Sequence, residues 1–121
     1  MTKIQNGKQY DLEDRTLLFA KDVRTFIKKI PRTIASIEDS AQVVRSSGSI
    51  GANYIEANES LGKKDFIFRI KICRKEAKET KYWLNLIEVG NDKSLEQECK
   101  RLLQEATELM MIFSSIMRKS V

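Results

Sequence analysis

Apolar residues recur at alternating steps of three and four positions in four long stretches of the chain. This spacing places the apolar side chains on one stripe of an α-helix. Short segments with turn-forming residues separate the stretches, at Pro31, at Gly62 and at 90-GND-92. We therefore expect four amphipathic helices, at about residues 11–30, 33–59, 63–89 and 94–118.

Each expected helix carries one such stripe, which we interpret as the side that faces the core. In the first helix the stripe contains Leu12, Thr16, Phe19, Val23, Phe26 and Ile30. In the second helix it contains Ile34, Ile37, Ala41, Val44, Gly48, Gly51, Ile55 and Asn58. In the third helix it contains Phe66, Ile70, Cys73, Ala77, Thr80, Leu84 and Ile87. In the fourth helix it contains Leu95, Cys99, Leu102, Ala106, Leu109, Phe113 and Ile116.

The expected connections between these helices are only a few residues long. Short connections place consecutive helices side by side in opposite directions. The predicted fold class is therefore all-α, an antiparallel up-down-up-down four-helix bundle that residues 1–121 form as a single domain. The chain contains no internal repeat, linker or low-complexity tract that would divide it.

The stretch 45-RSSGSIGANYIEANES-60 allows two interpretations, a phosphate-binding glycine loop or the interior of a helix. A phosphate-binding loop follows a strand and opens a helix, and no strand pattern precedes Arg45. Gly48 and Gly51 instead fall in phase with the apolar stripe, which favours the helix. Each glycine costs a helix about 1 kcal/mol relative to alanine. We therefore expect a neighbouring helix to approach closely at these positions.

Two segments of the chain, 42-QVVRSSGSIGANYIEANES-60 and 65-DFIFRIKICRKEAKETKYWLNLI-87, also resemble a known family. The hallmark residues of that family on its second helix are matched here by Arg45, Ser49, Ile50, Asn53 and Glu56. A glutamate in its third helix is matched by Glu79. On these residues the chain resembles the four-helix bundle proteins of the 23S rRNA intervening-sequence family. The resemblance covers about residues 12–88, with departures at 57-AN-58 and at Glu76.

The resemblance implies a compact bacterial helical bundle, often a ring-shaped homopentamer, and it implies no enzymatic activity. Accessory proteins of diversity-generating retroelements belong to the same broader group, form basic rings, and bind nucleic acid and a reverse transcriptase. The partners that the resemblance implies are therefore further copies of the chain, RNA or DNA, and a reverse transcriptase. A ribosomal subunit is not implied.

Seven cations occupy one sector of the third helix with no acid among them. This basic face consists of Lys63, Lys64, Lys71, Arg74, Lys75, Lys78 and Lys81. A stripe of this kind can neutralise several phosphates, with an affinity that falls steeply with salt. The alternative interpretation is a solvated helix face that keeps the protein soluble. Because no aromatic residue lies among the cations, we expect contacts to nucleic-acid backbone and none to bases.

A second set of residues forms a predicted polar network beside the core. It consists of Arg45, Ser49, Asn53, Glu56, Arg69, Glu76 and Glu79. In an antiparallel hairpin of the second and third helices, Arg45 lies near Glu76 and Glu79, and Glu56 lies near Arg69. We expect contacts at both places, with a structural role in fixing helix register. The chain contains no histidine, and di-metal bundles use Glu-x-x-His pairs, so we expect no metal site.

The second and third helices each carry a further group of apolar residues outside the predicted core stripe. We interpret these residues as an oligomer interface, composed of Val43, Ile50, Tyr54, Phe68, Ile72, Trp83 and Leu86. The alternative interpretation is a wide core face in an ordinary bundle. A monomeric bundle needs one apolar stripe per helix, so the second stripe favours a further buried contact.

The remaining composition bounds the function. The net charge is +5. The first fourteen residues lack the apolar core of a signal peptide, and no apolar run could span a membrane. We therefore expect a cytoplasmic protein. The absence of histidine removes the commonest general base, and no catalytic residues or cofactor are expected. We therefore predict a non-enzymatic oligomeric bundle that binds nucleic-acid backbone through its basic face. The alternative is a protein-interaction scaffold, or an accessory subunit, without direct nucleic-acid binding.

Overall fold

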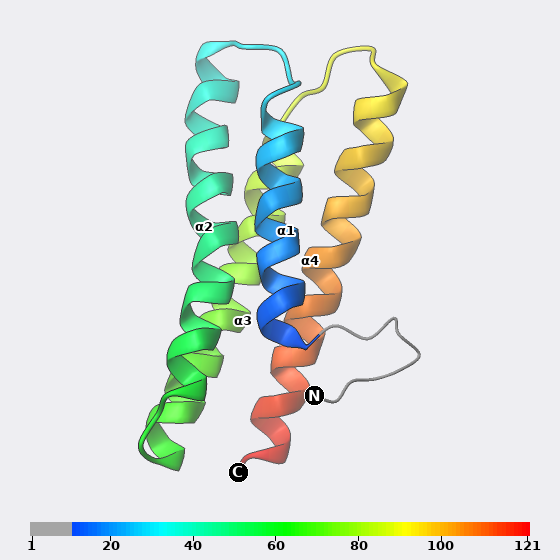
Figure 1. Cartoon of the computed structure of the whole chain (residues 1–121). Coiled ribbons are helices and arrows are strands. Elements are labelled where there is room, and N and C mark those ends of the chain that lie inside the picture. Colours follow the sequence, from blue (N-terminus) through cyan, green and yellow to red (C-terminus); the bar gives the residue numbers. More distant parts are fainter. Residues whose placement is uncertain (1–10) are drawn as a thin grey trace.

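The computed structural model describes residues 11–121 as a bundle of four helices, and the first ten residues of the predicted domain lie outside this part of the chain. The helices are α1 (Leu12–Ile27), α2 (Ile34–Asn58), α3 (Lys63–Leu86) and α4 (Lys93–Lys119). Figure 1 shows that successive helices are joined at alternate ends of the bundle. The chain is an all-α four-helix bundle, as the hydrophobic pattern predicts.

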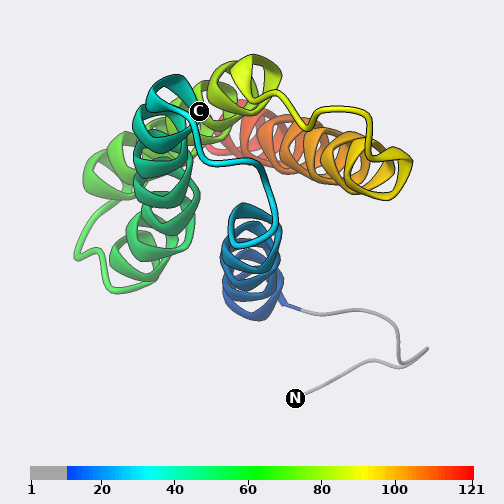
Figure 2. The ribbon, with the colours of Figure 1, turned by 90° about the horizontal axis from the view of Figure 1, so that it is seen from above.

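The arrangement of the helices follows from which pairs contact one another. The pair α2–α3 packs most extensively, followed by α3–α4 and α1–α2, while α1 and α4 share the smallest contact. Seen from above, α1 is set diagonally from α3, with α2 and α4 beside it (Figure 2). In residues 11–121, no helix is both long enough and apolar enough to cross a membrane.

Local capping chemistry sets the helix boundaries. The side chain of Asp11 accepts a hydrogen bond from Asp14 N at 2.8 Å at the start of α1. Thr33 and Ser36 form a reciprocal capping box at the start of α2. Asp92 caps α4 by accepting from Leu95 N at 3.1 Å. These caps satisfy backbone N–H groups that have no partner inside a helix.

Three of the four predicted core stripes are confirmed. The fully buried side chains include Phe19, Val23 and Phe26 of α1, Ile70 and Leu84 of α3, and Leu102, Leu109 and Phe113 of α4. All of them lie on the stripes that the steps of three and four identify. These residues form one continuous core between the helices.

The predicted core stripe of α2 is wrong. Ile34 is 87% exposed and Ile55 is 49% exposed, so most of this stripe lies outside the core. The core positions of α2 are instead Ser36, Val43, Ser46, Ser47, Ile50 and Ala57. Both stripes of α2 have helical spacing, and the true one contains serines that look polar in the sequence. Their hydroxyls are small enough to be buried when they find partners inside the bundle.

The two helical glycines have different surroundings. A Cβ built on Gly51 would lie 2.8 Å from Thr16 Oγ1, which is too close for ordinary contact. The expected close approach of a neighbouring helix is therefore confirmed at Gly51, where the neighbour is α1. At Gly48 the expectation is wrong for a single chain, because outside its own helix a Cβ would meet, among the described residues, only Arg24 Nη2 at 3.5 Å.

Candidate nucleic-acid interface and adjoining polar clusters

Four cations of α3 line one groove on the surface of the bundle. Lys71, Arg74, Lys75 and Lys78 stand at spacings that place them on one side of the helix, and the groove is completed by Met110 and Ser114 of α4. We call this site the basic groove, and its volume is about 500 Å³. Lys71, Lys75 and Lys78 are exposed, and Arg74 is half-buried. The groove is therefore open to solvent with its charges at the surface.

The other three predicted cations lie outside the basic groove. Lys63 and Lys64 are exposed in the first turn of α3, and Lys63 lines a separate cavity with Lys119 at the end of the bundle. Lys81 is half-buried one turn beyond Lys78. The structure therefore brings four of the seven predicted residues together in one groove.

The basic face carries charge that the rest of the described chain does not neutralise. In residues 11–121, none of the ion pairs involves any of its seven cations. Among the described residues no carboxylate lines the basic groove, and its remaining surface is a flexible thioether and a hydroxyl. Such a surface attracts anions with several charges, and it offers no aromatic ring on which a base could stack.

The predicted contact of Arg45 with two glutamates of α3 is present. Arg45 Nη2 donates a hydrogen bond to Glu79 Oε1, and Arg45 Nη1 lies 3.5 Å from Glu76 Oε1. Glu76 is only 7% exposed. Its Oε1 atom is close enough to Arg45 for an ion pair but has no partner with hydrogen-bond geometry among the described residues. This cluster joins the middle of α2 to the middle of α3.

The predicted contact between Glu56 and Arg69 is wrong. Arg69 Nη1 instead donates to Asn53 Oδ1 at 3.1 Å. Asn53 Nδ2 in turn donates to the carbonyl oxygen of Ser49 at 2.9 Å and to its hydroxyl at 3.0 Å. Asn53 lies level with Arg69 in the α2–α3 hairpin, whereas Glu56 lies almost one turn further along α2 and is exposed. The polar network is therefore two separate clusters.

One buried link between α2 and α3 was not found from the sequence. The hydroxyl of Thr80 lies 2.8 Å from Ser46 Oγ and 2.8 Å from the carbonyl oxygen of Glu76. Thr80 and Ser46 are both fully buried. The sequence signal was the helical phase of Ser46 with Val43 and Ile50, which identifies it as a core position.

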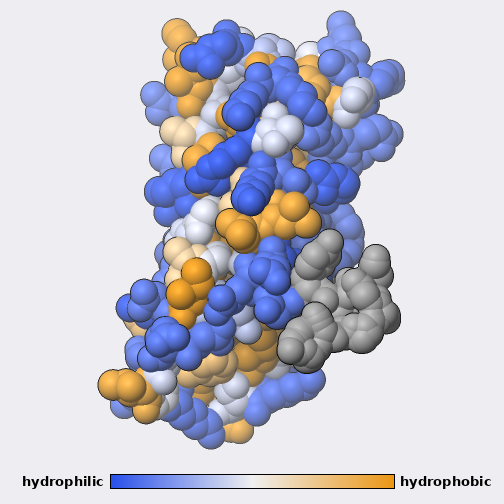
Figure 3. Space-filling model, viewed as in Figure 1, coloured by the Kyte–Doolittle hydropathy of each residue, from blue (hydrophilic) through white to orange (hydrophobic). Residues whose placement is uncertain are grey.

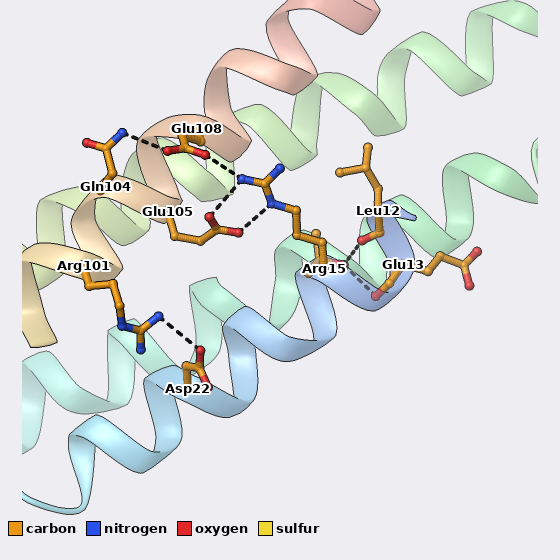
Figure 4. A network of polar contacts seen from close by, with 9 residues as sticks. Leu12, Glu13, Arg15, Asp22, Arg101, Gln104, Glu105 and Glu108 are labelled. Carbon is orange, nitrogen blue, oxygen red and sulfur yellow. Dashed lines mark hydrogen bonds and ion pairs between the residues drawn. The ribbon is translucent and has the colours of Figure 1, made fainter. Parts of the chain in front are cut away.

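Ion pairs hold α1 against α4 along their small contact. Arg15 bridges Glu105, at 2.7 Å from Nε, and Glu108, at 2.8 Å from Nη2 (Figure 4). Further pairs join Asp22 to Arg101 at 3.3 Å and Lys29 to Glu98 at 3.1 Å. This seam is not visible in the sequence, because periodicity within a helix does not reveal partners that are 69 to 93 residues apart.

Hydrogen bonds shift the pKa values of Arg15 and Glu108 in this seam. The pKa of Glu108 is lowered, mainly by the hydrogen bond from Gln104 and then by the hydrogen bond from Arg15. The pKa of Arg15 is raised, mainly by its hydrogen bond to Glu105. Both shifts favour the charged forms that make the ion pair.

The prediction of an oligomer interface is wrong for two of its residues. Val43 and Ile50 are fully buried in the core of the single chain, so they present no surface to a partner. Tyr54 is half-buried, with its ring centroid 5.8 Å from that of Phe113. Of the four predicted residues on α3, Phe68 is 57% exposed and Leu86 is 44% exposed, while Trp83 packs against the core. Ile72 and Trp83 between them are half-buried.

The two thiols are free and lie inside the bundle. Cys73 is buried, with Sγ 3.4 Å from the carbonyl oxygen of Ile50, and burial raises the pKa of its thiol to about 12. Burial also raises the pKa of Cys99. Residues 11–121 contain no group of three or more histidine, cysteine or carboxylate side chains placed to hold a metal ion.

Comparisons with known proteins agree with the architecture. Residues 8–115 match the family described as 23S rRNA-intervening sequence protein. A crystal structure from Bacteroides thetaiotaomicron, of a protein with unknown function from the S23 ribosomal protein family, is similar to this chain with 31% identity and a TM-score of 0.73. The similarity covers 87% of this chain and 96% of that one. A comparison with curated proteins gives no match.

Proposed function

The chain belongs to the 23S rRNA-intervening sequence protein family, and from this premise we propose that it is a non-enzymatic, homo-oligomeric bundle that binds nucleic-acid backbone through the basic groove. The observation that carries the proposal is the set of four cations on one side of α3 that line a groove without a carboxylate. Four cations that line one groove attract an anion with several charges more strongly than the same cations spread over the surface.

The dimensions of the basic groove suit a short length of backbone. Lys71 and Lys78 are seven residues apart, which corresponds to about 10 Å along a helix. Phosphates of one strand of duplex DNA repeat about every 3.4 Å along the axis, so about three of them fit this length. Ser114 adds a hydroxyl that can donate a hydrogen bond to a phosphate oxygen.

The proposed mode of binding carries no sequence information. Specificity for bases requires hydrogen bonds or stacking to base edges and faces, and the lining of the basic groove offers lysine, arginine, methionine and serine. We expect RNA and DNA of unrelated sequence to bind with similar affinity. In a homo-oligomer the basic groove is repeated on every subunit, which strengthens the attraction by multivalency.

The test is a binding titration of fluorescent generic RNA and duplex DNA at low salt. Charge reversal of Lys71, Lys75 and Lys78 to Glu is expected to reduce affinity at least a hundredfold. The matched control reverses Lys28, Lys93 and Lys100, which are exposed and do not line the basic groove. That control makes the same change of net charge, so retention of most of the affinity is expected.

Equal loss of affinity in both triple variants would contradict a localised site, because it would show that only net charge matters. Absence of binding by the unaltered protein at low salt would contradict the proposal as a whole. In that case the protein-interaction scaffold becomes the better account. The exposed apolar residues Leu17, Ile37, Ile55 and Phe68 are the observation that favours it.

A further inference from the structure

A concave site lies between α1 and α2 and shares no residue with the basic groove. Its volume of about 350 Å³ falls within the range of roughly 300–1,000 Å³ that is usual for small-molecule sites. We call it the apolar groove, because most of its lining residues are apolar or small, namely Leu17, Ala20, Gly48, Gly51, Ala52 and Ile55. Figure 3, which faces α1 and α2, shows apolar patches between hydrophilic side chains on this side of the molecule.

The charged residues that line the apolar groove stand at its two ends. Glu13 lies eight residues before Lys21 on α1, which corresponds to about 12 Å along the helix, and Arg24 lies almost one turn beyond Lys21. Glu13 Oε2 accepts a hydrogen bond from Asn58 Nδ2 at 2.9 Å, so this carboxylate already has a partner on α2. Lys21 and Arg24 make no ion pair with a described residue. The groove therefore has a cationic end without a counter-charge, followed by an apolar middle.

Arg24 is held over the groove with donors to spare. Its Nη1 donates to the carbonyl oxygen of Ala20, one turn earlier on α1, at 3.1 Å. Its Nη2 would lie 3.5 Å from a Cβ built on Gly48, so the guanidinium reaches across from α1 to the backbone of α2. Within residues 11–121, Nη2 has no hydrogen-bond acceptor. Its N–H groups can therefore donate to an acidic group bound in the groove.

Gly48 keeps the cationic end of the groove open. A glycine in the middle of a helix is unfavourable relative to alanine, and at Gly51 the close approach of Thr16 accounts for it. At Gly48 no described residue approaches that closely. A larger side chain at this position would fill the space beside Arg24. Space for a ligand next to the guanidinium accounts for glycine at position 48.

We propose that the apolar groove binds a single-chain amphiphile with a carboxylate head, such as a medium-chain fatty acid. The carboxylate pairs with Arg24 and Lys21, and the alkyl chain lies along Leu17, Ala52 and Ile55. Arginine binds carboxylates through charge-assisted hydrogen bonds, and burial of each methylene group adds to the affinity. This inference goes beyond the proposed function and does not depend on nucleic-acid binding or on an oligomer.

The two parts of the groove together select this class of ligand. A neutral apolar molecule would leave the cations of Lys21 and Arg24 without a partner. A nucleic acid or another polyanion would leave the apolar middle without one. One guanidinium with one ammonium group beside it suits a head with a single negative charge, whereas the four cations of the basic groove suit an anion with several charges.

The first test compares ligands that share one alkyl chain. Calorimetric titrations of the protein use decanoate, decanol and decyltrimethylammonium, each below the concentration at which it forms micelles. Decanoate is expected to bind about tenfold more tightly than decanol, because only decanoate makes charge-assisted hydrogen bonds, and the cation is expected to bind most weakly. Equal affinities for the three ligands would overturn the proposal, as would absence of decanoate binding.

The second test places the ligand in the groove. Arg24→Gln is expected to lower the affinity for decanoate to that for decanol and to leave the affinity for decanol unchanged. Ile55→Glu, at an exposed position, is expected to abolish binding of both ligands. The controls are Lys28→Gln, at an exposed cation of the same helix outside the groove, and Lys75→Gln in the basic groove. Both controls are expected to keep the affinity for decanoate, and all variants the helical circular dichroism spectrum.

Two further outcomes would overturn the proposed site. Decanoate affinity that is unchanged in Arg24→Gln and Ile55→Glu would show that the ligand binds elsewhere. Light scattering distinguishes a ligand from a protein partner in the groove. If the unaltered protein binds no decanoate and Ile55→Glu has a lower mass in solution, a second copy covers this surface. The titration with RNA and DNA is judged separately, because the two grooves share no residue.

Discussion

The two glycines of α2 show that the role of a residue depends on the atoms that surround it. Gly48 and Gly51 lie three residues apart on the same helix, yet the free space around them differs. Thr16 is fully buried, and its hydroxyl lies 2.7 Å from the carbonyl oxygen of Leu12, so it has little freedom to move away from Gly51. The same amino acid is therefore required by packing at one position and free of intramolecular constraint at the other.

These surroundings predict opposite effects of the same substitution. Gly51→Ala is expected to lower the free energy of unfolding by about 1–3 kcal/mol, because the added methyl group overpacks against Thr16. Gly48→Ala is expected to raise it by up to about 1 kcal/mol, because alanine is the better helix former. Urea denaturation of both variants as monomers measures the two values. Equal effects would contradict the described packing of α1 against α2.

Arg45 provides a second prediction at this scale. Arg45→Ala removes the cation from beside Glu76, which is almost fully buried. We expect the free energy of unfolding to fall by about 2 kcal/mol, below the 3–5 kcal/mol of fully buried pairs because Arg45 is half exposed. The control is Arg101→Ala, whose exposed pair with Asp22 should contribute less than about 1 kcal/mol. A loss at Arg45 no larger than that at Arg101 would refute the structural role.

At the scale of the helices, ion pairs line the seam between α1 and α4. The pKa of Glu108 is below its ordinary value of 4.5 in the folded chain. Near that pH the unfolded chain therefore binds more protons than the folded chain. The contribution of Glu108 to stability is present above pH 4.5 and is lost as the pH falls below it.

We predict that Glu108→Gln weakens the dependence of folding stability on pH in the acidic range. The unaltered protein should lose stability more steeply than the variant as the pH is lowered from about 5 to 3. Thermal unfolding at a series of pH values, at low salt, measures the difference. The same comparison with Glu96→Gln, an exposed glutamate in the first turn of α4, is the control. Parallel profiles for the unaltered protein and Glu108→Gln would contradict the proposed contribution.

The helices also show how far the sequence determines the fold. The number of helices and the core stripes of α1, α3 and α4 could be predicted, because each of these helices has its bulky apolar residues concentrated on one side. In α2 two stripes compete, and isoleucines occupy the exposed one while serines occupy part of the core. Hydrophobicity alone favours the wrong stripe there, since burial of Ser46 depends on its contact with Thr80 of another helix.

The candidate site was predictable only in part, for the same reason. The cations of α3 are visible in the sequence because they recur along one helix face. That four of them share a groove with Met110 and Ser114 depends on how α4 packs against α3. The contact of Arg69 with Asn53 depends on the axial register of α2 against α3. A shift of less than one helical turn would change the partner of Arg69.

At the scale of the whole molecule, the surfaces of the bundle are divided among its sides. The basic groove lies between α3 and α4, and the apolar groove, lined by Leu17, Gly48 and Ile55 among others, lies between α1 and α2. The proposed binding of nucleic-acid backbone uses the basic groove alone and leaves the apolar groove free.

The measurement that tests the central claim most directly is the salt dependence of binding to duplex DNA. The account predicts that log Kd for the unaltered protein changes linearly with the logarithm of salt concentration. It also predicts that replacing Lys71, Lys75 and Lys78 with Gln reduces the slope by about 2–3, at about 0.9 for each phosphate contact removed. A slope that is the same in the unaltered protein and the Gln variant would contradict binding through the basic groove.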